Sequence, residues 1–300
     1  MLKISKEQSV YSMSDKNTPV LHCKSGDVVL FETEDCFGGQ VQNADDRMGA
    51  IDWSRINPAT GPLYIDGAEP GDVLKVEIQK ITLADHGAMC EGPGEGITGQ
   101  AIVDEATKII PVHNGYFTFN KKLKFPIIPM IGVIGTAPAE GKSISTGTPD
   151  LHGGNMDCNR IGEGSTLYLP VSTPGALLAM GDMHARMGNG EVCVCGIEIA
   201  GEIQVKVTVL KDCSYPTPFL VNKTSMMAIY SALTLDEAAS GATLRMRRFL
   251  IDELGMDEHE SGFLLSAVGD VEICQCVDPN RTCRMEVPME VAEKYEYSWR

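Results

Sequence analysis

The sequence predicts a mainly β protein of the α+β class, with a β-sandwich-like or distorted barrel core and a few helices in the C-terminal third. Short alternating apolar runs recur along the chain, and 31 glycines and 16 prolines separate them. Strands do not alternate with helices, so a doubly wound parallel sheet is not expected. No low-complexity linker or fixed-period repeat is present, and residues 1–300 are therefore expected to form one integrated domain.

The β prediction depends on runs in which apolar and polar residues alternate. In the run 72–83, Leu74, Val76 and Ile78 alternate with polar residues, which indicates a strand with one buried and one solvated face. Gly201 indicates a bend or bulge inside the longest run. The runs are 27–33, 72–83, 165–171, 191–210 and 270–277.

One long helix is predicted over 235–254. Thr234 and Glu237 have the spacing of a capping box, and the apolar residues that follow recur with helical spacing. Gly255 is a suitable residue to end this helix. A shorter helix is expected over 258–267.

Composition narrows the classes of function. The chain has 25 basic and 41 acidic residues, a formal net charge of −16, which disfavours binding to nucleic acid or to an anionic membrane. No uninterrupted apolar stretch approaches the roughly 18 to 20 residues of a membrane helix. The first residues lack the apolar segment of a signal peptide, so a cytoplasmic location is expected.

The ten cysteines are expected to be free thiols in that compartment. Cys193 and Cys195, and likewise Cys274 and Cys276, are spaced C-x-C inside alternating runs. On a strand each pair would point to one face and pack as small buried residues. The chain has no C-x-x-C pair, so a zinc site built from thiolates is not expected.

The segment "GDMHARMGNGE" (181–191) contains the first candidate metal site. Asp182 and His184 are two residues apart, so on an extended chain their side chains share a face and converge on one point. Nitrogen and oxygen ligands suit zinc or another borderline divalent ion. A glycine-rich turn over 188–190 could return Glu191 on the adjacent strand, as a ligand or as a general base. The alternative is an Asp–His hydrogen bond that orders a turn.

The segment "LHGGNMDCN" (151–159) contains a second pair, His152 and Asp157. His152 could be a ligand or an acid–base group, and the alternative is an ordinary turn. Cys158 could act as a nucleophile only with a nearby base or a lowered pKa, so a bystander role is favoured.

Two further acids stand beside glycines. They are Glu140 in "PAEGK" and Asp35 in "TEDCFGGQ", where an acid next to glycine more often marks a turn. The glycines at 92–96 lack the context of a phosphate loop, and no G-x-S-x-G motif of serine hydrolases is present. His22, His86, His113 and His259 lie outside these segments and are expected to be surface or structural residues.

Taken together, these stretches resemble the acetamidase/formamidase family. The resemblance covers most of the first 200 residues, in the family's order, and the C-terminal third has few motifs. It implies a mainly β fold, hydrolysis of a short-chain amide to carboxylate and ammonia, a metal in the site, and a homo-oligomer, most simply a dimer. The matching strings are "FETEDCFGGQ" (31–40), "NPATGPLYIDGAEPGDVLKVEI" (57–78), "IGVIGTAPAEG" (131–141) and the long block 152–201 that begins "HGGNMDCNRIGEGS".

The resemblance also implies roles for individual residues. Family members often carry Asn or another residue at the position of Cys158, which weakens a nucleophilic role for this thiol. Zinc is the expected metal, with calcium or another divalent ion left open. The assigned residues are Glu191, Glu140 and Asp157 as catalytic groups, Asp182, His184, His152 and Asp35 as metal ligands, and Gly153, Gly154 and Asn155 as substrate-binding groups.

The expected mechanism uses metal-activated water with a carboxylate as the base. A metal lowers the pKa of bound water from about 15.7 toward about 7 and polarises the carbonyl group. The carboxylate takes the proton and delivers it to the departing nitrogen. Two alternatives stay open: a non-catalytic protein that binds a metal or small ligand, and a metal-free amidase with a Glu or Cys nucleophile.

Overall fold

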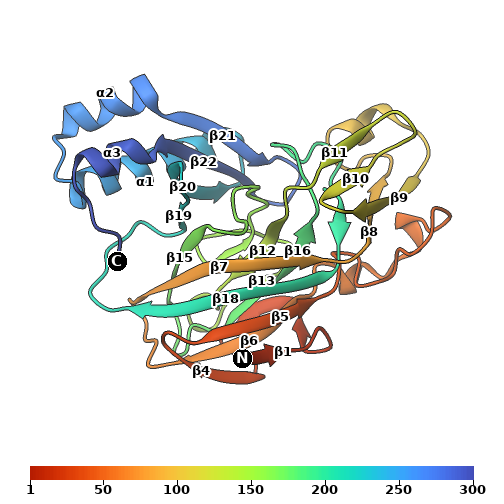
Figure 1. Ribbon diagram of the computed structural model, residues 1–300, viewed down its shortest axis with the longest axis horizontal. Helices are drawn as coiled ribbons and strands as arrows, with labels where there is room; N and C mark the ends of the chain where they lie inside the picture. The colour runs from red at the N-terminus through yellow and green to blue at the C-terminus, as the bar shows by residue number, and fades with distance from the viewer.

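The computed structural model describes residues 1–300 and has two large β-sheets at its centre (Figure 1). The first sheet includes strands from both ends of the chain. Its nine strands follow the order β1 (Leu2–Ile4), β5 (Val28–Thr33), β18 (Gly201–Leu210), β7 (Val73–Leu83), β15 (Thr166–Pro170), β19 (Phe219–Val221), β20 (Ser225–Ala232), β22 (Arg281–Pro288) and β21 (Asp270–Gln275).

The second sheet has eleven strands and supplies most of the chemistry described below. Strand β6 (Ala59–Asp66) pairs with its central strand β16 and also with β2 (Ser9–Val10) and β4 (Leu21–Lys24). The main path is β11 (Lys124–Pro126), β10 (Tyr116–Thr118), β9 (Ala106–His113), β8 (His86–Glu91), β17 (Glu198–Ile199), β16 (Leu178–His184), β12 (Met130–Gly135) and β14 (Gly153–Asn155). Strands β3 (Ser12–Ser14) and β13 (Ser143–Ser145) form a separate pair.

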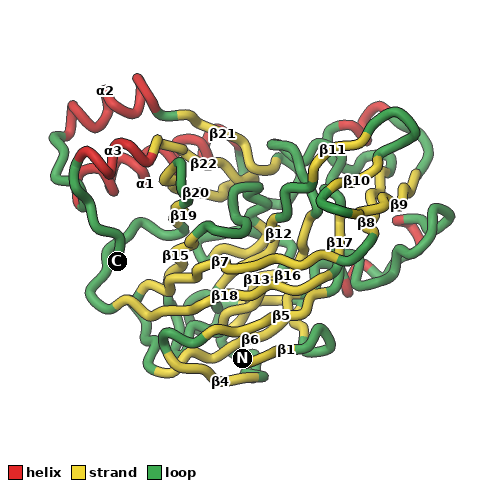
Figure 2. Tube along the Cα trace, in the orientation of Figure 1, coloured by secondary structure: helices red, strands yellow, loops and turns green.

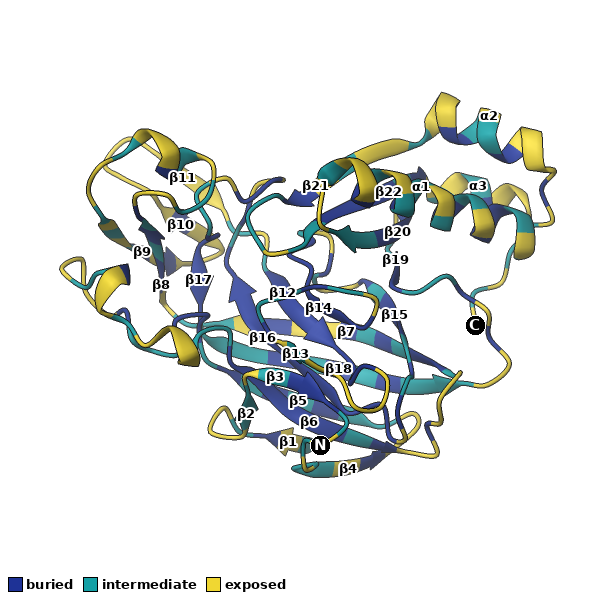
Figure 3. Ribbon diagram, turned by 180° about the vertical axis from the view of Figure 1, so that it is seen from behind, coloured by how far each residue is buried: buried dark blue, intermediate teal, exposed yellow.

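The two large sheets pack against each other through one shared apolar core. Phe31 and Val76 of the first sheet and Leu63, Ile134 and Met180 of the second belong to the same buried cluster. Figure 3 shows the buried strands at the centre and the exposed loops around them. The sheets do not close into a barrel, so of the two predicted forms the sandwich-like one is observed.

Alternation in the run 72–83 corresponds to β7, where Leu74, Val76 and Ile78 are buried. A register shift opposite Gln204 and Val205 then turns Ile81 inward. The predicted break at Gly201 is also present. Strand β17 ends at Ile199 in the second sheet, and the chain enters the first sheet as β18.

The helices gather at one end of the first sheet, as Figure 2 shows. Phe249 of α1 stacks on Phe219 of β19, with ring centroids 4.6 Å apart, inside a second apolar core. The three α-helices are α1 (Leu235–Asp252), α2 (Glu258–Val268) and α3 (Met289–Lys294), and short 3-10 helices occur at Met48–Ala50, Trp53–Arg55 and Thr98–Ala101. No helix combines the length and apolar character that a membrane crossing demands.

The capping box at the start of α1 forms as predicted. Thr234 Oγ1 accepts a hydrogen bond from the Glu237 backbone N–H, and Glu237 Oε2 accepts one from the Thr234 N–H, both at 3.2 Å. These contacts satisfy two backbone donors that the first turn of a helix leaves without partners.

We predict that Thr234→Ala lowers the free energy of unfolding by about 1 kcal/mol, because it removes this cap. Urea denaturation followed by circular dichroism measures the change. Ser240→Ala is the matched control, since Ser240 is exposed in the same helix and caps nothing. Equal stability of Thr234→Ala and wild type would contradict the role of the cap.

Candidate active site

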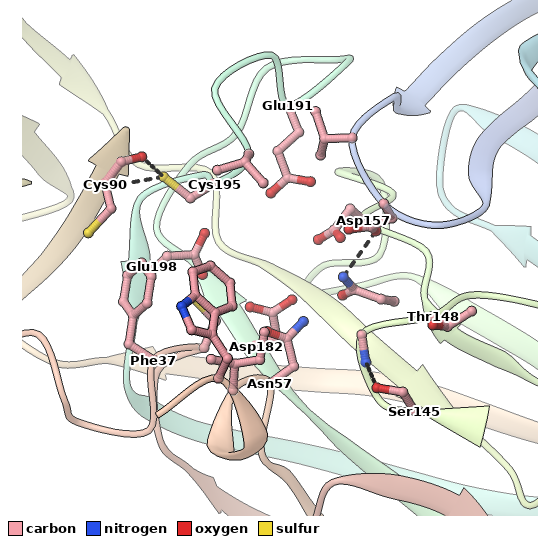
Figure 4. A pocket seen from close by; sticks show the side chains of 18 of the residues that line it. Phe37, Asn57, Cys90, Ser145, Thr148, Asp157, Asp182, Glu191, Cys195 and Glu198 are labelled. Atoms are coloured by element: carbon pink, nitrogen blue, oxygen red, sulfur yellow. Dashed lines mark hydrogen bonds between the residues drawn. The ribbon is translucent and has the colours of Figure 1, made fainter. Parts of the chain in front are cut away.

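A cavity of about 260 Å³ lies where β14, β16 and β17 meet several loops. Figure 4 shows the carboxylates of Asp182, Glu191 and Glu198 pointing into it. Its lining combines acidic and apolar side chains. The apolar ones include Phe37, Met48, Trp53, Ile56 and Val194, and the polar ones include Asn57, Asn155, Asp157, Asp182, Glu191, Glu198 and Asp278.

His184 contacts acids of this lining, although it does not itself line the cavity and is only 1% exposed. It is the last residue of β16, which neighbouring strands flank on both sides in the second sheet. Four carboxylates from different segments surround the imidazole. Its Nε2 lies 3.1 Å from Glu198 Oε2, 3.4 Å from Asp182 Oδ1, 3.7 Å from Asp157 Oδ1 and 3.9 Å from Glu191 Oε1.

Strand pairing accounts for the closest of these contacts. In the antiparallel pair β16–β17, His184 lies directly opposite Glu198, so their side chains share one face of the sheet. The Gly196 N–H donates to Glu198 Oε1 at 2.7 Å and fixes the carboxylate. Glu198 Oε2 is then free to face the imidazole ring.

The other acids depend on an unusual backbone. Asp157, Asp182 and Glu191 have φ angles of 43°, 53° and 49°. L-residues rarely adopt this left-handed region, and such conformations concentrate at functional sites. Gly132 on β12 makes room for two of these side chains, because a Cβ there would overlap Asp157 Oδ1 and lie 2.5 Å from Asp182 Oδ2.

Negative charge exceeds positive charge in this buried cluster. Burial raises the pKa of both Asp157 and Glu191 well above the usual range, and neighbouring carboxylates raise it further. Burial likewise raises the pKa of Glu198 to about 7. Burial opposes protonation of His184, but the carboxylates of Glu198 and Asp182 outweigh it and raise the pKa of the imidazole. One imidazolium cannot neutralise four surrounding acids.

The donor atoms fit a divalent cation. Two groups of three side chains each bring one ligand atom within 4.8 Å of the others: Asp157, His184 and Glu191, and Cys36, Asp182 and Glu198. Asp157 Oδ1 and Glu198 Oε2 are buried without a hydrogen-bond partner. Imidazole, carboxylate and thiolate are ligands that zinc and similar ions accept.

Glu191 reaches the cluster by a route that differs from the one expected. The prediction of an adjacent strand is wrong, because residues 185–197 form a loop between β16 and β17. The loop is attached to the end of β21, where Gly190 N donates to Cys274 O at 2.9 Å and Cys276 N donates to Gly190 O at 3.2 Å. Cys193 and Cys195 lie in this loop and not on a strand.

No feature of the sequence indicated a site role for four polar lining residues: Cys36, Asn57, Glu198 and Asp278. Glu198 sits between Ile197 and Ile199, where alternation would assign a polar residue to solvent. Asp278 comes from the loop after β21 and accepts a hydrogen bond from Asn155 Nδ2 at 3.0 Å. Their positions depend on pairing between distant segments, which local sequence patterns do not reveal.

Several predicted site residues lie outside the cavity lining. Glu140 is exposed on a loop, and Gly153 and Gly154 form β14 beside β12. His152 is buried but lines a different cavity.

The Asp35 carboxylate accepts a hydrogen bond from the Gly39 N–H at 3.1 Å and shapes the loop that carries Cys36 and Phe37. Burial raises the pKa of Asp35 to about 6.

Cys158 is fully buried in the core between the sheets and does not line the cavity. A hydrogen bond with Cys274 lowers the pKa of the Cys158 thiol to about 7, in spite of its burial. Substrate in the cavity would therefore not contact this sulfur.

Comparisons with known proteins show a family relationship. The family model described as "Acetamidase/Formamidase family" matches residues 14–143 and 139–294. The acetamidase structure from Bacillus halodurans is 44% identical, with a TM-score of 0.96 over 98% of this chain and 99% of that one. The structure of a predicted acetamidase/formamidase from Thermoanaerobacter tengcongensis is 41% identical, with a TM-score of 0.96 over 99% of both chains.

Curated relatives are more distant. The formamidase of Methylophilus methylotrophus is 28% identical over 63% of this chain and 61% of its own length. The chain thus spans about 60% of the length of the curated relatives that it matches. The family match itself extends over nearly the whole sequence, and the chain therefore belongs to the acetamidase/formamidase family.

Proposed function

We propose that the protein hydrolyses short-chain aliphatic amides of the formamide and acetamide type to carboxylate and ammonia, with a divalent metal, preferably zinc, in the His184 cluster. Membership of an amidase family supports the reaction class. The proposal of a metal rests on one observation: four carboxylates are buried around one imidazole at the edge of a cavity.

A cation would be held by Asp157, His184 and Glu191, or by Cys36, Asp182 and Glu198. When bound, such an ion supplies Lewis-acid polarisation of an amide carbonyl and lowers the pKa of water. The Gly196 N–H holds Glu198 in place, and the other oxygen of this carboxylate contacts His184 Nε2.

Glu191 is the best placed proton carrier if the second set, Cys36, Asp182 and Glu198, holds the cation. Its carboxylate points into the cavity from a loop, on the side opposite Asp182 in Figure 4. It would take a proton from the attacking water and transfer it to the nitrogen of the leaving amine.

The rest of the cavity suits a small amide. The side-chain amides of Asn57 and Asn155 line the wall and can hydrogen-bond to a substrate carbonyl or NH₂ group. Phe37, Met48 and Trp53 form an apolar wall against which a short acyl chain can pack. A homodimer and a cytoplasmic location stay predictions from the sequence.

Two alternative functions predict different results in an ammonia assay. A non-catalytic metal-binding protein would release no ammonia from formamide or acetamide. A metal-free amidase would keep full activity after exhaustive chelation and would depend on Glu140 or Cys158. Exposure of Glu140 and burial of Cys158, both outside the cavity lining, favour the metal-dependent reaction.

We predict that Asp182→Ala and His184→Ala each lose bound metal and lose activity by at least about 100-fold, because mutation of supporting residues alone typically costs 10- to 100-fold. The Glu191→Gln variant separates the two possible roles of Glu191. If Glu191 is the base, the variant loses turnover and keeps its metal. If Glu191 is a ligand, the variant loses both. Elemental analysis and an ammonia assay on C1 to C4 amides provide the measurements. Glu140→Gln is the control and should retain both. Full metal content and activity in His184→Ala would show that the assignment is wrong.

We predict that Gly132→Ala also lowers metal content and activity, although residue 132 is no ligand. Its new methyl group would displace the carboxylates of Asp157 and Asp182 together. Gly188→Ala is a matched control beside Glu191, because a Cβ there meets nothing within 4 Å. The same two assays apply. Unchanged metal binding in Gly132→Ala would mean that these two carboxylates do not act as ligands.

We predict that Cys158→Ser keeps more than half of the wild-type amidase activity, since the side chain does not reach the cavity. The ammonia assay is compared with a thermal melt, because a hydroxyl in an apolar core destabilises the fold. Complete loss of turnover in a folded variant with full metal content would support a thiol mechanism instead.

A further inference from the structure

A second cavity, of about 310 Å³, shares no lining residue with the first. It lies where α1 meets the loops that precede β14 and β19 and the loop that follows β15. Its walls are mostly polar. They include Lys142, Asp150, His152, Ser172, Thr217 and Arg245.

Arg245 enters this cavity from α1 without an acidic partner. One guanidinium nitrogen, Nη1, donates to the Ile229 carbonyl, and the guanidinium carbon lies 4.7 Å from the centroid of the Tyr230 ring. Burial lowers the pKa of Arg245 to about 10, and no carboxylate offsets this effect. Most of its five N–H donors are left for another group.

His152 lines the same cavity and is 3% exposed, and neither of its ring nitrogens has a hydrogen-bond partner. Buried polar groups are nearly always hydrogen-bonded, so such a ring calls for an explanation. Its backbone is fixed, because His152 O accepts a hydrogen bond from Thr136 N at 3.1 Å. Both ring nitrogens are buried in this conformation, so the ring turns toward the cavity when it donates an N–H to a ligand.

The charge of the wall favours an anion. Arg245 and Lys142 contribute two positive charges, and Asp150, whose Oδ1 accepts a hydrogen bond from Leu151 N at 2.7 Å, contributes one negative charge. The wall therefore carries a formal charge of +1, whereas the whole chain carries −16. A neutral ligand would leave the half-buried guanidinium without a countercharge.

We propose that this second cavity binds a small oxyanion, a carboxylate or a phosphate, through the guanidinium of Arg245 and an N–H of the His152 ring. The fork of N–H groups on arginine matches both ligands and can hold two oxygens at once. Hydroxyls of Ser172 and Thr217 are further donors in the wall. This site does not depend on the proposed amidase reaction.

Isothermal titration calorimetry with sodium acetate and, separately, sodium phosphate tests the proposal, with sodium chloride at equal ionic strength as the blank. Wild type should show saturable binding of at least one probe. Affinity should fall at least tenfold in Arg245→Gln and less in His152→Gln. Arg248→Gln, on the exposed side of the same helix, is the matched control and should bind like wild type.

The probes and variants also identify the ligand and the site. Binding of acetate but not phosphate selects a carboxylate, and the reverse selects a phosphate. Acetate is also a product class of the proposed reaction, so Glu191→Gln is titrated in parallel and should retain the binding that Arg245→Gln loses. Failure of both probes to bind, or binding that depends on Glu191 and not on Arg245, would overturn the proposal.

A second measurement is needed in case Arg245→Gln does not fold, because the variant loses the contact with Ile229. Wild-type crystals soaked in the probe that binds should show its density between Arg245 and His152. Density only in the catalytic cavity, or none at either place, would overturn the proposal.

Discussion

Repulsion among the carboxylates buried around His184 is the constraint that the rest of the site must satisfy. Removing one charged group from water costs several kcal/mol, and like charges at these distances add to that cost. Asp157, Asp182, Glu191 and Glu198 surround a single imidazole. Protons or a cation must offset their charge, and a fold that keeps them together without either would lose stability. The cluster is thus not a stabilising ion pair, and its excess negative charge is what supports the proposed cation.

The second sheet supplies the rigidity that this cluster requires. Strand β16 is fully buried and lies between β12 and β17, so His184 and the residue opposite it cannot move apart without breaking the sheet. Two glycines leave the space that the side chains of the cluster need. Gly132 leaves space for two carboxylates, and Gly196 approaches the His184 ring so closely that a Cβ would lie 2.5 Å from Nδ1. The left-handed backbone of Asp157, Asp182 and Glu191 adds strain, and the packing of the surrounding sheet holds the chain in this conformation.

Local patterns predicted what depends on neighbours in sequence. Alternation in 72–83 identified β7, a capping box identified the start of α1, and the spacing of Asp182 and His184 placed both side chains in contact. Contacts between distant segments were not predictable in this way. Glu198 joins the site through strand register, and Asp278 through a loop more than 90 residues from His184 in the sequence. Glu140 matches a family motif, yet its exposed loop lies outside the cavity lining, and a motif does not reveal which way such a loop turns.

The C-terminal third, which has few family motifs, nevertheless holds part of the site in place. The end of β21 forms backbone hydrogen bonds with Gly190, directly before Glu191, and the following loop contributes Asp278. Strand β21 lies at the sheet edge and is paired only with β22, which α1 covers with the second apolar core. Edge elements open locally at a lower free energy than buried central strands do. Loosening this end of the molecule should therefore release Glu191 and Asp278 while His184, Asp182 and Glu198 stay fixed in the second sheet. The site thus combines a rigid half on β16 and β17 with a half whose order depends on the packing of the C-terminal helices.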